Sequence, residues 1–307
     1  MQKTQVMGLF DWALLLILSI LWGGSFFFSK IALSELPPFT VVLARVAIAA
    51  MTLFTYLRAT RQAIPTASST WVQFFGMGLL NNCIPFSLLF WGQTHIASGL
   101  ASILNATTPI FSIIAAHFLT SDERMTPNKV AGIVSGFMGV ALLMAGNAFS
   151  SQELPFLALL ACLAAALSYG FAGVFGRRFR RMGIAPAIGA FGQTAATTVM
   201  MIPIVLLVDA PWHLGRPSGL TVAALIGLGL ISTALAYVIF FHILAVGGAI
   251  NSSLVTLLIP LSAILLGRLF LGEMLALNHF AGLTLISLGL LLIDGRLFRL
   301  LHREQAG

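Results

Sequence analysis

Apolar stretches of similar length follow one another along the whole chain and are separated by short breaks. A helix that crosses about 30 Å of hydrocarbon at 1.5 Å per residue needs about 20 apolar residues. The breaks combine charges, Gly and Pro, as in Glu35-Leu36-Pro37-Pro38 and Asp209-Ala210-Pro211, which are costly to place in lipid. The pattern predicts an all-α integral membrane protein with ten transmembrane helices, at residues 11–31, 38–58, 72–93, 97–119, 128–147, 154–175, 185–208, 219–241, 247–271 and 278–298.

Composition supports this interpretation. Of the 307 residues, 59% are hydrophobic and 8% are charged, whereas about a quarter of the residues of a soluble domain are charged. The net charge of +7 is also compatible with nucleic-acid binding. However, the basic residues lie in short segments between apolar stretches and are not interleaved with aromatic residues. We therefore expect a lipid bilayer as the environment and no nucleic acid as a partner.

The distribution of basic residues predicts the orientation of the chain, because Lys and Arg are retained in cytoplasmic loops. With the N-terminus inside, only Lys30, Arg216 and Arg268 remain outside. We expect a multi-pass protein of a bacterial inner membrane with both termini in the cytoplasm. The basic residues that this orientation places inside are Arg58, Arg61, Arg124, Lys129, Arg177, Arg178, Arg180, Arg181, Arg296, Arg299 and Arg303.

The two halves of the chain carry similar residues in the same order, at an offset of about 150 positions. We predict two five-helix repeats, at residues 1–148 and 149–307. Because five is odd, the second repeat enters the membrane from the opposite side, which produces an inverted-topology repeat around a central cavity. The matched positions are Trp22-Gly23 with Tyr169-Gly170, Arg45 with Gln193, Asn81-Asn82 with Ser232-Thr233, and Pro109 with Pro260.

The chain resembles the drug/metabolite transporter superfamily, in its ten-helix EamA branch. The resemblance covers nearly the whole chain and depends on Leu21-Trp22-Gly23-Gly24-Ser25, Arg45, Pro109, Pro260 and Phe270-Leu271-Gly272-Glu273. It implies that helices 1–4 and 6–9 surround a central cavity, while helices 5 and 10 are peripheral and do not line the pathway. It also implies small-molecule substrates such as amino acids, metabolites or drugs.

Polar residues deep in apolar helices indicate where a substrate would bind. Amides and hydroxyls that faced lipid would lose their hydrogen bonds with water, so we expect them to face the interior. Hydrogen bonds between helices explain such residues equally well, but the aromatic rings beside them favour a pocket for an apolar or aromatic metabolite. The candidate substrate-binding residues are Trp22, Ser25, Arg45, Asn81, Asn82, Phe86, Phe90, Trp91, Asn105, Thr108, Tyr169, Gln193, Ser232, Tyr237 and His242.

Four of the singled-out positions carry specific expectations. Arg45 lies about 10 Å inside helix 2, where it contacts either a substrate carboxylate or loop carbonyl groups. His242 is either a ligand or pH-sensitive group, or a packing residue. Pro109 and Pro260 each remove a backbone N–H and are expected to be hinges of the two symmetry-related gating helices.

The sequence offers no chemistry for catalysis. Cys83 and Cys162 lie inside apolar stretches and lack the Cys and His spacing of zinc sites and redox motifs. HExxH and GxSxG motifs, which would supply an intramembrane enzyme with a metal site or a nucleophile, are absent. We therefore expect no catalytic residues, no metal and no other cofactor.

Two transport functions remain. The first, which we favour, is export of aromatic or other apolar amino acids and related metabolites by alternating access. The second is a proton-coupled multidrug efflux pump, which usually needs a carboxylate inside the membrane. The acidic residues of this chain instead fall at or near the ends of the predicted helices. Gly132, Gly136 and Gly139 along helix 5 allow close helix packing, either within the chain or at the seam of a homodimer.

Overall fold

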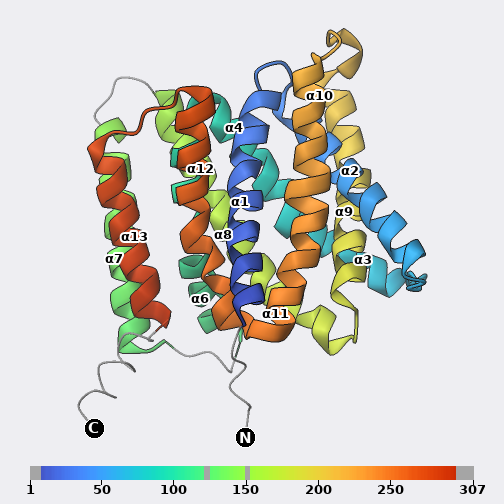
Figure 1. The fold of residues 1–307 in the computed structure, drawn as a ribbon, viewed down its shortest axis with the longest axis horizontal. Helices are drawn as coiled ribbons and strands as arrows, with labels where there is room; N and C mark the ends of the chain where they lie inside the picture. The colour runs from blue at the N-terminus through green and yellow to red at the C-terminus, as the bar shows by residue number, and fades with distance from the viewer. Residues whose placement is uncertain (1–7, 121–124, 149–152, 295–307) are drawn as a thin grey trace, which may run out of the picture.

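The computed structural model describes residues 8–120, 125–148 and 153–294, and this part of the chain is a bundle of steep helices (Figure 1). Within the described residues, eight helical runs are long and apolar enough to cross a membrane, and two shorter apolar helices, Val255–Leu271 and Leu277–Ile293, complete the ten predicted spans. We call the face where α1 begins and α13 ends the terminal face (lower in Figure 1) and the other the opposite face. The fold-class prediction is confirmed.

The first five spans contain seven α-helices and one π-helix. In order they are α1 (Leu9–Ala32), α2 (Pro38–Ala59), α3 (Ser68–Gly78) continued by the π-helix η1 (Leu79–Cys83) and α4 (Ile84–His95), α5 (Ser98–Asn105) followed by α6 (Thr108–Leu119), and α7 (Pro127–Ala148).

The last five spans repeat this scheme from the opposite face. In order they are α8 (Glu153–Arg181), α9 (Pro186–Ile204) with the π-helix η2 (Val205–Asp209) and the 3-10 turn η3 (Pro211–His213), α10 (Gly219–Ile226) with the π-helix η4 (Gly227–Leu235) and α11 (Ala236–Ser253), α12 (Val255–Leu271), and α13 (Leu277–Asp294).

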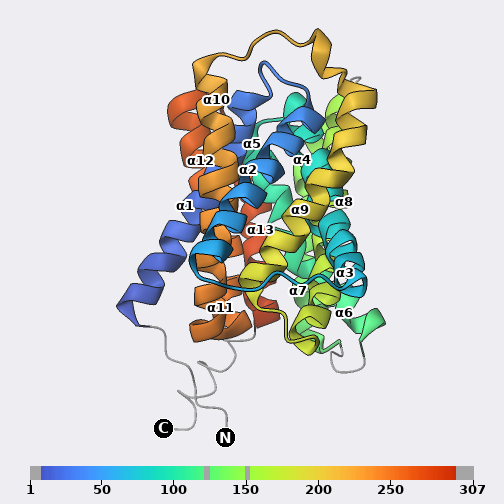
Figure 2. The ribbon, with the colours of Figure 1, turned by 90° about the vertical axis from the view of Figure 1, so that its right-hand side faces the viewer.

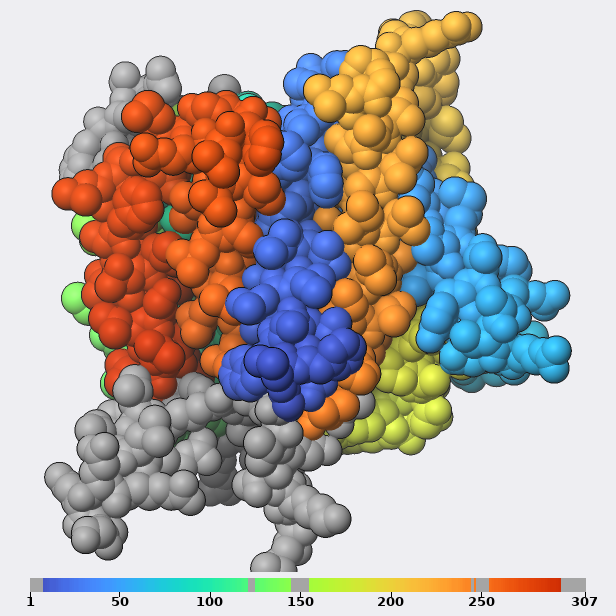
Figure 3. Space-filling view, viewed as in Figure 1, coloured from blue at the N-terminus to red at the C-terminus, as the bar shows by residue number. Residues whose placement is uncertain are grey.

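Neighbouring helices alternate between the two repeats. In the first repeat α1 lies between α12 and the α10–α11 run of the second, as the space-filling view shows (Figure 3). From the side, α2 lies against α9 and η4 (Figure 2). Apolar side chains from both repeats, such as Leu18, Ile103, Leu159 and Leu228, are fully buried in one large core cluster. The two repeats therefore share one core.

Two breaks between helical segments differ from the predicted ones. The break predicted after residue 241 is wrong, because α11 continues to Ser253 and α12 begins at Val255. The fourth span is interrupted at Ala106 and Thr107, just before Pro109. Pro109 has no N–H, so it donates no helical hydrogen bond to the backbone carbonyl of Asn105. That carbonyl accepts a 2.7 Å hydrogen bond from Thr108 Oγ1 instead. The apolar pattern gives no sign of either change.

The glycines of the fifth span serve packing within the chain. Helices α7 and α13 lie side by side at one edge of the bundle (Figure 1). A Cβ at Gly139 would lie 2.7 Å from the carbonyl oxygen of Gly282, and one at Gly132 would collide with that of Gly289. Such a backbone contact requires glycine on the α7 side. These glycines therefore lie in the contact between α7 and α13, within one chain.

At the opposite face, carboxylates accept hydrogen bonds from the first residues of other helices. Asp209 Oδ2 accepts hydrogen bonds from the backbone N–H of Thr40 (2.6 Å) and from Thr40 Oγ1 (2.7 Å), at the start of α2. Glu35 accepts bonds from Ser218 N (2.7 Å) and Ser218 Oγ (2.6 Å), at the start of α10. A carboxylate is favourable at a helix N-terminus, where backbone N–H groups lack partners. These bonds lower the pKa of Glu35, so its contact is present at neutral pH and is lost only as the pH falls through that lowered pKa.

The Leu-Gly-Glu turn after α12 makes a third contact of this kind. Gly272 has φ +65°, a left-handed conformation that favours glycine, and it ends α12. The turn brings Glu273 to the start of α5, where it accepts bonds from Ser98 N (2.8 Å), Ser98 Oγ (2.7 Å) and Gly99 N (3.3 Å). The sequence motif thus connects the second repeat to the first at the opposite face.

Candidate functional site

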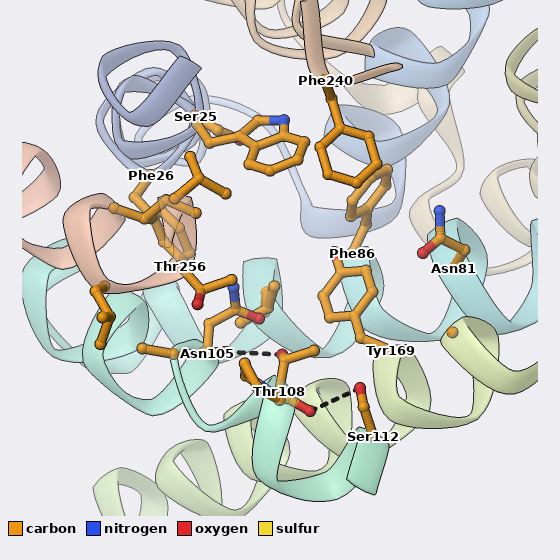
Figure 4. A pocket seen from close by; sticks show the side chains of 18 of the residues that line it. Ser25, Phe26, Asn81, Phe86, Asn105, Thr108, Ser112, Tyr169, Phe240 and Thr256 are labelled. Carbon is orange, nitrogen blue, oxygen red and sulfur yellow. Dashed lines mark hydrogen bonds between the residues drawn. The ribbon is translucent and has the colours of Figure 1, made fainter. Parts of the chain in front are cut away.

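A cavity of about 960 Å³ lies between the two repeats. It extends from Ser29 and Gln93, near the opposite face, to Lys129 and Ile293, near the terminal face. Its volume is at the upper end of the range for small-molecule sites, about 300–1,000 Å³. Side chains from α1 to α7, including η1, meet others from α8, α9, η4, α11, α12 and α13 of the second repeat around it, and Figure 4 shows part of this lining. A solute in this cavity would contact both repeats.

Aromatic rings form much of the wall. Trp22 from α1 lies 5.3 Å from Phe240 of α11, between ring centroids. Phe86 of α4 is stacked with Phe90 at 6.2 Å and meets Tyr169 of α8 edge-on at 6.5 Å. Figure 4 shows Phe86, Tyr169 and Phe240 bordering the same hollow. Rings arranged in this way suit an apolar or aromatic group of a ligand.

Two π-helices occupy matching positions in the third and eighth spans. η1 carries Asn81 and Asn82, and η4 carries Ser232 and Thr233. Such widened turns are rare and occur often at functional sites. In η1 the widening precedes Pro85, which has no N–H for the carbonyl of Leu80. Ser168 Oγ of α8 donates to that carbonyl at 2.7 Å instead.

A hydrogen-bond network joins η1 to the second repeat. Asn81 Nδ2 donates to Gln193 Oε1 at 2.9 Å and to Tyr237 OH at 3.3 Å. Asn82 Nδ2 donates to Thr197 Oγ1 at 3.2 Å, and Asn82 Oδ1 accepts from Tyr237 OH at 3.3 Å. Both ends of the Asn82 side-chain amide are therefore hydrogen-bonded within the protein. In the Asn81 side chain, by contrast, Oδ1 makes no hydrogen bond within the described chain.

Two buried polar atoms have no hydrogen-bond partner in the part of the chain that the structure describes: Asn105 Oδ1 and Ser232 Oγ. Both residues line the cavity. Asn105 lies beside Thr108 and Ser112, and Thr256 of the second repeat borders the same hollow (Figure 4). An unsatisfied buried polar atom costs about 1–3 kcal/mol.

The structure brings most of the candidate residues together around the cavity. Asn105 and Thr108 come from the broken fourth span, and Gln193 comes from the matched position of Arg45. The candidates that line the cavity are Trp22, Ser25, Arg45, Asn81, Phe86, Phe90, Asn105, Thr108, Tyr169, Gln193, Ser232 and Tyr237, together with the predicted hinge Pro109.

Four other candidates lie elsewhere. Asn82 is fully buried in the network just described. Trp91 lies beside His95, at 5.0 Å between ring centroids, because position 91 is off the α4 face of Phe86 and Phe90. His242 is 47% exposed in its side chain and lies 3.3 Å from Asp11 of α1. Pro260 is buried inside the uninterrupted helix α12.

The sequence interpretation overlooked several lining residues. Gln93 shares the helix face of Phe86 and Phe90 at spacings of seven and three residues, so helical periodicity could have identified it. The expectation that helices 5 and 10 stay away from the pathway needs correction. Although both are peripheral, Lys129 of α7 and the end of α13 line the terminal-face end of the cavity. The lining residues of α13 are Leu290, Leu291 and Ile293.

Polar contacts close the bundle at the opposite face, and we call Ser29, Lys30, Gln93, Ser98 and Glu273 the seal. Ser29 Oγ donates to Gln93 Oε1 at 2.7 Å. Lys30 Nζ donates to the carbonyl of Gln93, in the last turn of α4, where a cation is favourable. With Glu273 on Ser98, these bonds connect α1, α4, α5 and the end of α12 above the cavity.

Comparisons with known proteins agree with this architecture. Residues 11–145 and 156–294 each match the EamA-like transporter family. The chain is 27% identical over 277 residues to a protein of Bacillus subtilis named "uncharacterized transporter YoaV", covering 89% of this chain and 92% of that one. It is 25% identical over 291 residues to an Escherichia coli protein named "probable amino-acid metabolite efflux pump", covering 91% and 93%.

The fold is also found among solved structures. One crystal structure has a TM-score of 0.68 and 21% identity to this chain, and the match covers 94% of this chain and 97% of the other. At this identity the likeness concerns the fold alone.

Proposed function

Because the chain belongs to the EamA-like transporter family, and is therefore a multi-pass membrane transporter and not an enzyme, we propose that it exports amino acids with aromatic or other apolar side chains, and related metabolites. The observation that carries this proposal is the cavity between the repeats, with its aromatic wall and the polar side chains of Arg45, Asn81 and Asn105 among its lining residues. Rings receive an apolar side chain, while the polar atoms receive the charged groups of an amino acid. The name of the Escherichia coli relative supports the same substrate class.

The competing function, a proton-coupled pump for cationic drugs, has less support. No acidic side chain is among the residues that line the cavity in the described part of the chain. Such a pump would need a carboxylate there to attract a cation and exchange protons.

Counterflow in proteoliposomes tests the proposal. Vesicles preloaded with unlabelled phenylalanine, tryptophan or leucine should accumulate the labelled amino acid, whereas vesicles preloaded with a quaternary ammonium drug should not. Protein-free vesicles and vesicles with heat-denatured protein provide the controls. Accumulation driven by the cationic drug alone, with no response to the amino acids, would contradict amino-acid export and favour the pump.

For the mechanism, the proposal is alternating access between two arrangements of the repeats. In the present arrangement the seal closes the opposite face, while the cavity extends to the terminal face. The basic segments Arg58–Arg61, at the end of α2, and Arg177–Arg181, at the end of α8, belong to the terminal face and support a cytoplasmic position for it, in a bacterial inner membrane. Export would begin with loading in this state, and opening to the outside would require the seal to separate.

Thiol labelling tests both orientation and access. In a Cys83→Ala, Cys162→Ala background, Ser112→Cys in the cavity should react with a membrane-impermeant maleimide in inside-out vesicles but not in intact cells, because the cavity opens to the cytoplasm. Arg216→Cys, in the exposed loop of the opposite face, should show the reverse pattern. The opposite result at both positions would overturn the orientation.

The same assay tests the seal. Glu273→Gln removes the charge that holds the start of α5, so Ser112→Cys should become reactive from both sides of the membrane. Glu35→Gln, which weakens a carboxylate contact at the same face away from the cavity, is the matched control and should leave the labelling pattern unchanged. Equal labelling in both variants would exclude Glu273 as part of the closure.

A further inference from the structure

Arg45 is a buried cation in the wall of the cavity. Its residue is 6% exposed, and it comes from the middle of α2. Nε donates a 2.9 Å hydrogen bond to Thr233 Oγ1 of η4, and Thr233 Oγ1 in turn donates to the carbonyl of Leu228 at 2.7 Å. The guanidinium carbon lies 3.7 Å from the ring centroid of Phe86 and 5.7 Å from that of Phe90. The hydrogen bond to η4 and the contacts with the two rings of α4 therefore hold the guanidinium in one orientation.

This cation has no carboxylate partner among the described side chains. Each of the described acidic side chains is occupied elsewhere: Asp11 contacts His242, Glu35 binds Ser218, Asp209 binds Thr40, and Glu273 binds Ser98. The described residues also give Nη1 and Nη2 of Arg45 no hydrogen bond, and Arg45 lines the cavity. The two terminal nitrogens of the guanidinium, which together form a fork of N–H donors, can thus bind a ligand.

An unpaired charge in this position is expensive. Burial of an ion without a partner is strongly unfavourable, and intramembrane Arg residues pair or mark a substrate path. Contact with Phe86 and Phe90 offsets part of this cost, because a ring face attracts a cation. Rings cannot accept the N–H bonds of the fork, whereas a carboxylate accepts two of them in parallel.

Building on the proposed function, we infer that Arg45 is the specificity-determining residue of the cavity and binds the carboxylate of an organic substrate. The aromatic wall receives the apolar body of the substrate. A single guanidinium in this part of the wall favours a carboxylate over a phosphate, which usually binds several cationic donors.

The inference makes the carboxylate, and not the ammonium group, the required part of the substrate. Binding to purified protein in nanodiscs can be measured by calorimetry for two pairs of ligands: L-phenylalanine with L-phenylalaninamide, and 3-phenylpropionate with 3-phenylpropanamide. Each acid should bind about ten- to a hundred-fold more tightly than its amide, the factor expected for hydrogen bonds to a charged group.

Substitution of Arg45 should remove this preference. Arg45→Gln should weaken binding of both acids by about ten- to a hundred-fold and leave both amides unchanged, and Arg45→Lys should be intermediate because it keeps the charge without the fork. Arg178→Gln, at an exposed cation that contacts Phe175 outside the cavity, is the matched control and should change none of the affinities. Since Arg45 has no carboxylate partner, the Gln variant should retain the folded yield of the wild type.

The outcomes separate this inference from the proposed function. Counterflow of amino acids without any acid-to-amide difference in the wild type would overturn the carboxylate site and leave amino-acid export standing. Tight binding of 3-phenylpropionate that depends on Arg45, with no amino-acid counterflow, would support the carboxylate site and overturn amino-acid export. An equal loss for acids and amides in Arg45→Gln would show that Arg45 acts only through the structure, and would overturn the inference even if the variant were unstable.

Discussion

Asn105→Ala should weaken substrate binding by about ten- to a hundred-fold while leaving the protein at least as stable as the wild type. The affinity falls because a hydrogen bond to a charged substrate group contributes about 1.5–3 kcal/mol. The stability does not fall because Asn105 Oδ1 has no hydrogen-bond partner within the described chain, so the free protein loses no bond when it is removed. Calorimetric binding and the apparent melting temperature of the same preparation measure the two effects.

Two other asparagines provide matched controls. Asn82→Ala removes an amide that is bonded at both ends, to Thr197 and Tyr237, so it should lower the melting temperature. Asn128→Ala, at an exposed position at the start of α7, should change neither quantity. If Asn105→Ala binds substrate as tightly as Asn128→Ala does, Asn105 is not part of the binding site. If it lowers the melting temperature as much as Asn82→Ala, the side chain has a structural role.

Gly23→Ala and Gly170→Ala should each lower the apparent melting temperature by roughly 2–10 °C, because overpacking of a close contact costs about 1–3 kcal/mol. A Cβ at Gly23 of α1 would lie 2.9 Å from the backbone nitrogen of Ala263 in α12 and would collide with Ser262. A Cβ at Gly170 of α8 would lie 2.8 Å from the backbone carbon of Phe111 in α6. Backbone atoms cannot move aside as the end of a flexible side chain can.

The neighbouring glycines give controls with the opposite sign. At Gly24 the nearest atom to an added Cβ is 3.8 Å away, in the ring of Phe28, and at Gly173 it is Ser112 Oγ at 3.7 Å. Because Ala is favoured over Gly in a helix by about 1 kcal/mol, Gly24→Ala and Gly173→Ala should leave stability unchanged or raise it. Equal melting temperatures for all four variants, measured by thermal aggregation in detergent, would refute the close-packing explanation.

These glycines also show what the repeat means physically. In each repeat a first helix carries an aromatic–glycine pair, Trp22-Gly23 or Tyr169-Gly170. In each case the glycine packs against a helix that contains one of the two matched prolines: Gly23 against α12 with Pro260, and Gly170 against α6 with Pro109. The aromatic partner then lines the cavity. The pairing noticed in the sequence therefore corresponds to one packing arrangement used twice, once from each side of the membrane.

The pattern of apolar stretches alone specifies the ten spans, their all-α class and the inward position of most polar residues. The reason is that lipid imposes a simple rule on every segment: about 20 apolar residues span the bilayer, and an amide or guanidinium must avoid hydrocarbon. Arg45, Asn105 and Tyr169 could be identified on that basis alone, and all three line the cavity. The tight turn at Gly272 followed by Glu273 was visible as a motif, although its partner Ser98 was not.

Which of several neighbouring polar residues faces the cavity depends on the tertiary structure. Asn81 lines it and the adjacent Asn82 does not, and the π-helical turn of η1 alters the helical phase on which any sequence-based choice depends. Likewise, the end of α11 at Ser253 depends on packing, because the apolar sequence continues across it. Local hydrophobicity specifies burial, whereas the face that a side chain presents depends on how the whole bundle packs, through contacts between residues more than a hundred positions apart.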